Sequence, residues 1–170
     1  KSVTCCAAWS PDGRRFAVRM RPHNVMIADA DTGRQLLPLL PCGDIVESLA
    51  WNPDGTMLAA AEISERLRLF SASTGKEVAT WTIGPAPLGR GIHHVAWRPD
   101  GTRLADAGRS LCVWDSALLE TSPVFEHVPS TGTLYAINWS PDGNRLAVAD
   151  NKNITIYDAT AGAPAQVLRV

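Results

Sequence analysis

The sequence has little of what usually ties a protein to nucleic acid or to a membrane. Its 170 residues carry a formal net charge of −1 and a pI of about 6.5, whereas nucleic-acid and anionic-membrane surfaces usually need clustered Lys and Arg. No apolar run approaches the roughly 18 residues that span a bilayer, and the first residues form no signal-like apolar core. We therefore expect no nucleic-acid partner, no membrane partner and a cytoplasmic location.

Cysteine is also scarce, and its spacing fits neither a metal site nor a disulfide framework. Cys5, Cys6, Cys42 and Cys112 form no C-x-x-C pair, and the adjacent Cys5 and Cys6 would point to opposite faces of a strand. We interpret all four as reduced core thiols, which are typical of the cytoplasm.

The sequence does contain one turn signature, repeated four times. Its tryptophans recur 42, 46 and 42 residues apart, a period in the low forties that is typical of propeller blades, and the segments between them show no 3.6-residue helical pattern. The four copies are Trp9-Ser10-Pro11-Asp12-Gly13, Trp51-Asn52-Pro53-Asp54-Gly55, Trp97-Arg98-Pro99-Asp100-Gly101 and Trp139-Ser140-Pro141-Asp142-Gly143.

Each Pro-Asp-Gly favours a tight hairpin. Proline presets φ near −65° at the second turn position, aspartate suits the third, and glycine accepts the left-handed conformation at the fourth, which together predict a type I turn with a bulge. We assign these twelve residues to the turns and the four tryptophans to the core. The repeated carboxylates are accordingly interpreted as turn residues, not catalytic ones.

Strand-forming runs flank every turn, so each repeat predicts four antiparallel strands. The expected first strands are Val3 to Trp9, Ile45 to Trp51, Ile92 to Trp97 and Leu134 to Trp139, and the second are Phe16 to Val18, Leu58 to Ala61, Leu104 to Ala107 and Leu146 to Ala149. The expected third strands are Val25 to Ile27, Leu67 to Phe70, Leu111 to Trp114 and Ile154 to Tyr157, and the fourth are Gln35 to Leu40, Val78 to Ile83, Pro123 to Val128 and Gln166 to Val170.

The fold class predicted is all-β: a β-propeller of four four-stranded antiparallel blades, at about residues 3–40, 45–83, 92–128 and 133–170. In the first strands a large face containing the tryptophan alternates with a small one, which carries Ala8, Ala50, Ala96 and Asn138. A large face can nest on the small face of the next sheet at the roughly 10 Å sheet spacing. Replacing Trp51 or Trp97 by Ala should therefore cost about 3–5 kcal/mol.

These repeats resemble the WD-repeat family of β-propellers over the whole chain. The signature is the aromatic residue, Ser-Pro-Asp-Gly, a Leu-Ala strand and then an aromatic residue followed by Asp, as in Val113-Trp114-Asp115 and Ile156-Tyr157-Asp158. The first two repeats end differently, and no repeat has the family's Gly-His dipeptide. The positions aligned with the family's aspartate between second and third strands hold Pro22, Ser64, Gly108 and Asn151.

No pattern in the sequence predicts catalysis, a cofactor or a metal. His93 and His94 would diverge to opposite faces of a strand and so cannot chelate one ion, while His23 and His127 fall in expected loops without a second ligand. There is no G-x-S-x-G elbow for a nucleophile. The glycines of segment 84–91 lack the lysine and following helix of a phosphate loop, so this segment is interpreted as an insertion between blades and a possible contact loop.

Function is therefore expected to reside in surfaces. The resemblance implies that partners dock on the rim shared by the loops between second and third strands and between fourth and first strands. On this chain that rim would contain Arg21, Pro22, His23, Glu62, Glu65, Arg66, Arg90, Arg109, His127, Asn151 and Lys152.

The leading hypothesis is a non-enzymatic protein-interaction scaffold, a WD-repeat segment of a larger regulatory or signalling protein. The alternative is an accessory propeller that controls substrate access to a hydrolase domain elsewhere in the parent chain. We expect four blades to form an open arc, with apolar outer faces that present Cys6 and Ala8 or Trp139 and Ile137. Further blades of the parent chain, which we favour, or a second copy of this one would cover those faces.

Overall fold

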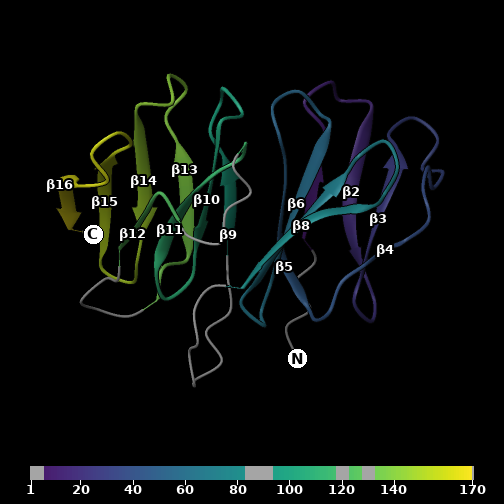
Figure 1. The fold of residues 1–170 in the computed structure, drawn as a ribbon, viewed down its shortest axis with the longest axis horizontal. Coiled ribbons are helices and arrows are strands. Elements are labelled where there is room, and N and C mark those ends of the chain that lie inside the picture. The colour runs from purple at the N-terminus through teal and green to yellow at the C-terminus, as the bar shows by residue number, and fades with distance from the viewer. Residues whose placement is uncertain (1–5, 83–93, 118–122, 128–132, 170) are drawn as a thin grey trace. The chain divides into compact units, whose positions relative to one another are not determined.

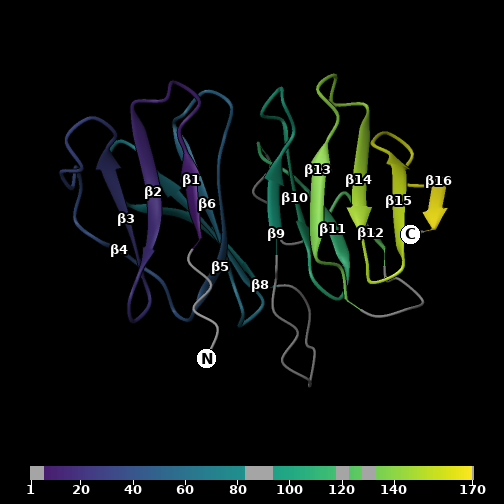
Figure 2. The ribbon, with the colours of Figure 1, turned by 180° about the vertical axis from the view of Figure 1, so that it is seen from behind.

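The computed structural model describes residues 6–82, 94–117, 123–127 and 133–169. Its sixteen strands form four four-stranded antiparallel sheets, and the described residues contain no helix. The expected all-β blades are confirmed. The chain divides into two compact units, residues 1–92 and 93–170, each holding two sheets (Figure 1, and from behind in Figure 2).

Unit 1 contains blades one and two, each a meander in which successive strands pair. Blade one consists of β1 (Ala7–Trp9), β2 (Arg15–Met20), β3 (Asn24–Asp29) and β4 (Leu40–Pro41). Blade two consists of β5 (Val46–Trp51), β6 (Met57–Glu62), β7 (Arg66–Ser71) and β8 (Glu77–Thr82).

Unit 2 contains blades three and four, with the same strand order. Blade three consists of β9 (His94–Trp97), β10 (Arg103–Ala107), β11 (Leu111–Asp115) and β12 (Phe125–His127). Blade four consists of β13 (Ala136–Trp139), β14 (Arg145–Ala149), β15 (Asn153–Asp158) and β16 (Pro164–Arg169).

The fourth strand of blade one is much shorter than expected. Segment 35–40 was predicted to be extended, but only an isolated bridge from Gln35 to Ala28 precedes the two-residue β4. Pro38 explains the break, because a proline has no N–H to donate to a sheet ladder. The expected strand residues at 3–5, 83, 92–93, 128 and 170 lie outside the described part of the chain.

The four Trp-x-Pro-Asp-Gly segments adopt the same turn geometry. In blade one, Gly13 N donates to Ser10 O and Ser10 N donates to Arg15 O, both at 2.9 Å. The four turn glycines have φ between 69° and 75°, the left-handed region that a side chain strains. The carboxylate of Asp12 accepts from Ser10 Oγ and Arg14 N, and these bonds lower the pKa of Asp12.

In each unit, a tryptophan of the second sheet donates a hydrogen bond to the first sheet. In unit 1, Trp51 is buried and its indole Nε1 donates to Ala8 O at 3.0 Å. In unit 2, Trp139 Nε1 donates to Ala96 O at the same distance. The large face of the second sheet therefore nests on the small face of the first, as the alternation predicts.

Trp9 departs from its assignment to the core, because its side chain is 66% exposed. It lies on the face of blade one that points away from blade two, where no described sheet of unit 1 covers it. The expected outer faces were also wrong. Cys6 and Ala8 pack into the core of unit 1, and Ile137 and Trp139 are buried in the core of unit 2.

Candidate functional site

The linker between β4 and β5 holds the loop rim of unit 1 together. We use "unit 1 rim" for residues 21–23, 42–43 and 62–66. Cys42 N donates to His23 O at 2.8 Å, and Gly43 N donates to Glu62 Oε1 at 2.9 Å. Residues from the β2–β3 turn and from the β6–β7 turn, which are far apart in sequence, therefore meet at one linker.

Glu62 was expected on the exposed rim but is fully buried. Besides Gly43 N, its carboxylate accepts from Arg68 Nε at 2.6 Å and from Ser64 Oγ at 3.1 Å, and Arg68 also pairs with Glu77. Burial of a charge requires such partners. Glu62 therefore anchors the rim from inside and is unavailable to a docking protein.

Glu65 is also buried, at 9% exposure, and this corrects its assignment to the solvated rim. It has φ of 66°, and its N–H donates to Glu62 O at 3.3 Å, which closes the tight β6–β7 turn. A non-glycine residue in the left-handed region is uncommon and marks a tightly constrained turn.

His23 and Cys42 of the unit 1 rim are half-buried, and its exposed members are Arg21, Pro22, Gly43, Ser64 and Arg66. His23 Nδ1 has no hydrogen-bond partner among the described residues. Burial, with a further contribution from Glu62, raises the pKa of the adjacent Cys42 thiol to about 12. Cys42 is therefore protonated at neutral pH, so it is not an activated nucleophile.

In unit 2, Arg109, Asn151 and Lys152 are exposed on the turns that join the second and third strands of each blade. Sequence reasoning missed Asp150, whose Oδ1 accepts from Lys152 N and Asn153 N, both at 2.7 Å. These backbone bonds lower the pKa of Asp150. The acidic turn residue was missed because it lies one position before the aligned Asn151.

His127 was assigned both to the expected fourth strand of blade three and to a rim loop, and it belongs to strand β12, where it pairs with Leu111. Its ring packs edge-on against Tyr157 at 5.3 Å between centroids, which gives it a packing role within unit 2. Arg90 and the contact loop at 84–91 lie outside the described residues.

Sequence reasoning also missed a buried acid in blade three. Asp106 on β10 is almost fully buried, and the indole of Trp114 on β11 donates to its Oδ2. Burial raises the pKa of Asp106 to about 8. A lone acid within the apolar run Leu104 to Ala107 was the available signal, because such a group needs a partner or a proton.

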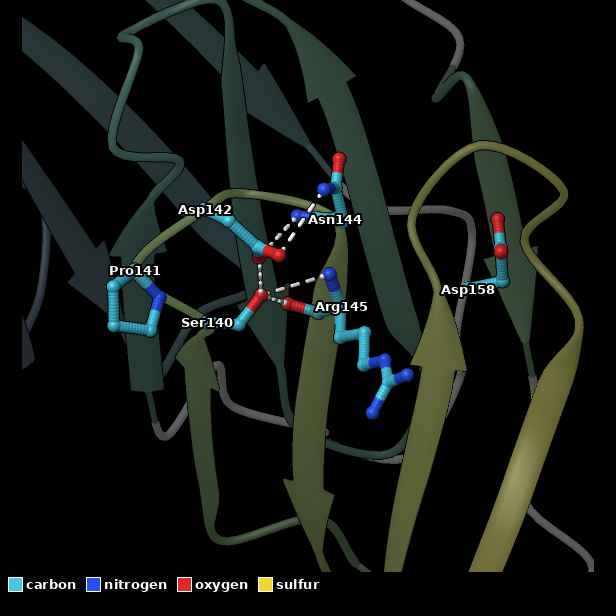
Figure 3. Close-up of a pocket in the computed structure, with 6 residues that line it drawn as sticks. All are labelled: Ser140, Pro141, Asp142, Asn144, Arg145 and Asp158. Carbon is cyan, nitrogen blue, oxygen red and sulfur yellow. Dashed lines mark hydrogen bonds between the residues drawn. The ribbon is translucent and has the colours of Figure 1, made fainter.

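Blade four carries an open depression of about 700 Å³ beside its Pro-Asp-Gly turn. Figure 3 shows its lining: Ser140, Pro141, Asp142, Asn144, Arg145 and Asp158. Most of the polar groups are already used, because Ser140 Oγ and Asn144 N both donate to Asp142 Oδ1. The arginine side chain extends away from this network.

The described residues offer no metal centre, since no three His, Cys, Asp or Glu side chains gather there. His94 accepts a weak hydrogen bond at Nδ1 from Ile137 N at 3.4 Å, and burial lowers its pKa. In the described part of the chain there is also no helix long and apolar enough to cross a membrane.

Two family profiles match the chain. The "anaphase-promoting complex subunit 4 WD40 domain" profile matches residues 41–89, and the "WD domain, G-beta repeat" profile matches residues 121–158. A search of curated proteins finds no match.

Solved structures show the same fold at low identity. A chain of Kuenenia stuttgartiensis hydrazine synthase superposes with a TM-score of 0.85 and 19% identity over 97% of this chain and 48% of that one. A chain of a mitotic checkpoint complex gives a TM-score of 0.85 and 23% identity over 96% of this chain and 52% of that one. The chain thus spans about half the length of both structures. Its repeats, its sheets and both profile matches support the WD-repeat family of β-propellers.

Proposed function

We propose that the chain is a non-enzymatic protein-interaction scaffold, a WD-repeat segment of a larger regulatory or signalling protein. The two WD-type profile matches support an interaction role, and one structural neighbour belongs to a multiprotein assembly, the mitotic checkpoint complex. Binding sites often occupy irregular loops on a rigid scaffold. We place the contact surface on the exposed residues of the loop rims.

The anchored rim of unit 1 is the observation that carries this proposal. The linker residues Cys42 and Gly43 are hydrogen-bonded to both neighbouring turns, and Glu62 is buried beneath them. Arg21 lies in the β2–β3 turn and Arg66 begins β7, so both are held beside hydrogen-bonded turns, which lowers the entropy cost of binding. Two exposed guanidinium groups fit an acidic protein segment, because arginine recognises carboxylates with directional hydrogen bonds.

The test is proximity labelling in the native cells with the full-length parent protein as bait. We compare the wild type, an Arg21→Glu/Arg66→Glu variant and a matched control, Arg14→Glu/Arg34→Glu. The control places the same charge change on exposed residues at the opposite ends of the blade-one strands. We expect a discrete set of proteins to be lost with the rim variant alone.

A protein lost in this way is then purified and its affinity measured directly. The rim variant should bind it at least about tenfold more weakly than the control, a difference of about 1.4 kcal/mol. Equal labelling by all three baits would refute the assignment of the contact surface to the rim. Equal affinities of the two variants for the purified partner would do the same.

A further inference from the structure

Within each unit, arginine side chains of the first blade donate hydrogen bonds to backbone carbonyls of the second blade. In unit 1, Arg15 of blade one reaches blade two, where Nη2 donates to Gly55 O at 2.9 Å and Nη1 to Ala72 O at 3.4 Å. Its guanidinium also lies 4.8 Å from the ring centroid of Trp51. One side chain therefore binds the turn carbonyl, a second carbonyl just after β7, and the tryptophan that joins the sheets.

Unit 2 uses the same two acceptor positions with two arginines. Arg98 Nε donates to Gly143 O at 2.9 Å, and Arg103 Nη1 donates to Ala159 O at 2.5 Å. Gly143 is the turn glycine of blade four, as Gly55 is of blade two, and Ala159 follows β15 as Ala72 follows β7. The carbonyls that a preceding blade recognises are therefore the same in both units.

Blade four carries an arginine at the same position on its outer face, which is the face that points away from blade three. Arg145 follows the turn glycine by two residues, as Arg15 and Arg103 do, and it is exposed. Among the described residues its guanidinium makes no hydrogen bond or ion pair, and Figure 3 shows it extending along the sheet away from Asp142.

The sheet beneath Arg145 is apolar and only partly covered. Ile154, Ile156 and Leu168 occupy the register positions that Val25, Ile27 and Leu40 hold in blade one. The blade-one residues are 0–1% exposed against blade two, whereas Leu168 is 45% exposed and both isoleucines are partly exposed. Asn138 replaces Ala8 at the position whose carbonyl accepts a tryptophan indole in unit 1.

Blade one presents the acceptor side of the contact on its own outer face. Trp9 is 66% exposed and its ring lies 6.0 Å from that of Phe16. Gly13 is the turn glycine of this blade, and Ala30 follows β3 with the same backbone bond, Ala30 N to Arg14 O, that Ala72 makes to Thr56 O. The outer face of blade one thus offers the groups that Arg15 binds on blade two.

We propose that the outer face of blade four binds the outer face of blade one in a second copy of this chain. Trp9 of that copy lies on Ile156, its indole donates to Asn138 O, and Arg145 donates to Gly13 O and Ala30 O. The chain carries both halves of the contact, and each half matches an interface already built inside a unit. The association is head-to-tail, because two unlike surfaces meet.

Analytical ultracentrifugation over a wide concentration range tests the proposal on the chain as it exists. The wild type should sediment as a dimer or longer series, and Arg145→Glu and Trp9→Ala should each weaken association at least about tenfold. Lys76→Glu and Val78→Ala are matched controls, since both residues are exposed in blade two, outside the two faces. They should leave the association unchanged.

Mixing the two variants separates a head-to-tail contact from any other. The Trp9→Ala chain keeps an intact blade-four face and the Arg145→Glu chain keeps an intact blade-one face, so an equimolar mixture should form one heterodimer while each variant alone stays monomeric. A mixture that remains monomeric overturns the proposal. So does a wild-type chain that is monomeric at every concentration, a result that favours a further blade in the same polypeptide as the occupant.

Discussion

The two units use different arginines to form the hydrogen bonds between their blades. In unit 1 a single residue, Arg15, reaches both carbonyls of the next blade, while in unit 2 the two carbonyls are divided between Arg98 and Arg103. The acceptors are backbone carbonyls at the same two positions of the second blade in both units. The donating arginine can precede the Pro-Asp-Gly turn of the first blade, as Arg98 does, or follow it, as Arg15 and Arg103 do. The repeat thus preserves acceptor geometry while the donor side chain varies.

The units also differ in how they bury an acid. Glu62 in unit 1 is paired with Arg68 and with the linker N–H of Gly43. Asp106 in unit 2 receives a neutral indole N–H from Trp114, and burial raises its pKa. A neutral donor compensates burial of a carboxylate less well than a cation does, so burial favours the protonated form of Asp106. The stability of unit 2 should therefore depend on pH through Asp106.

The largest expected effect concerns the tryptophan that both units share. Replacing Trp51 or Trp139 by Ala should cost about 3–5 kcal/mol of unfolding free energy, because each leaves a cavity between two sheets. The exposed Trp9 is the matched control, and its replacement by Ala should cost less than about 1 kcal/mol when measured at concentrations where the chain is monomeric. Hydrogen exchange resolved by unit is the measurement, and equal effects at Trp9 and Trp51 would contradict the packing described.

The buried acid of unit 2 should make its stability fall as pH rises. The pKa of Asp106 is raised from 3.8 to about 8 by burial, so between these values the folded state binds more protons than the unfolded state. The contribution is fully present below about pH 4 and is lost towards pH 8, with a slope of at most about 1.4 kcal/mol per pH unit. Urea unfolding between pH 4.5 and pH 8 measures it.

Asp106→Asn is the control for this titration, because asparagine keeps an acceptor for the Trp114 indole without an ionisable group. The difference in stability between wild type and variant should shift steadily in the variant's favour from pH 4.5 to pH 8. A pH-independent difference would show that Asp106 does not titrate in this range.

Replacing the buried acid of unit 1 should reduce the free energy of unfolding by less than replacing a buried tryptophan does. Glu62→Gln retains the size of the side chain but weakens the bonds to Arg68 and Gly43, so we expect a cost of about 1–3 kcal/mol. Glu77→Gln is the matched control, since Glu77 is more exposed and should cost less than about 1 kcal/mol. Exchange of the Gly43 amide should accelerate only in Glu62→Gln.

The repeat, the turns and the strand order could be predicted from the sequence because they depend on local chemistry. Gly13 and its counterparts need a left-handed φ, and a tryptophan four residues earlier ends each first strand. The shortened β4 was not predicted, because Pro38 was read as part of the extended run Gln35 to Leu40, although it cannot donate to the ladder.

The candidate surface was less predictable, because exposure depends on contacts between distant segments. Glu62 resembles any polar residue at a strand end until Gly43 and Arg68 are seen around it. Trp9 has the same local sequence as Trp51, yet one is exposed and the other buried. No local pattern distinguishes them, since the difference lies in which sheet packs against each face.

The smallest expected effect concerns the arginine hydrogen bonds between blades in the two units. Arg15→Met should cost about 1–2 kcal/mol, since it removes two hydrogen bonds and a cation–π contact from one interface. Arg98→Met and Arg103→Met should each cost about 0.5–1 kcal/mol, because each removes one hydrogen bond to the next blade and leaves the other carbonyl bound. The exposed pair of Arg98 with Asp100 contributes little. The double variant Arg98→Met/Arg103→Met should then approach the cost of Arg15→Met. Unit-resolved hydrogen exchange measures all four variants. A single unit 2 variant that costs as much as Arg15→Met would show that the two carbonyl contacts are not shared between Arg98 and Arg103.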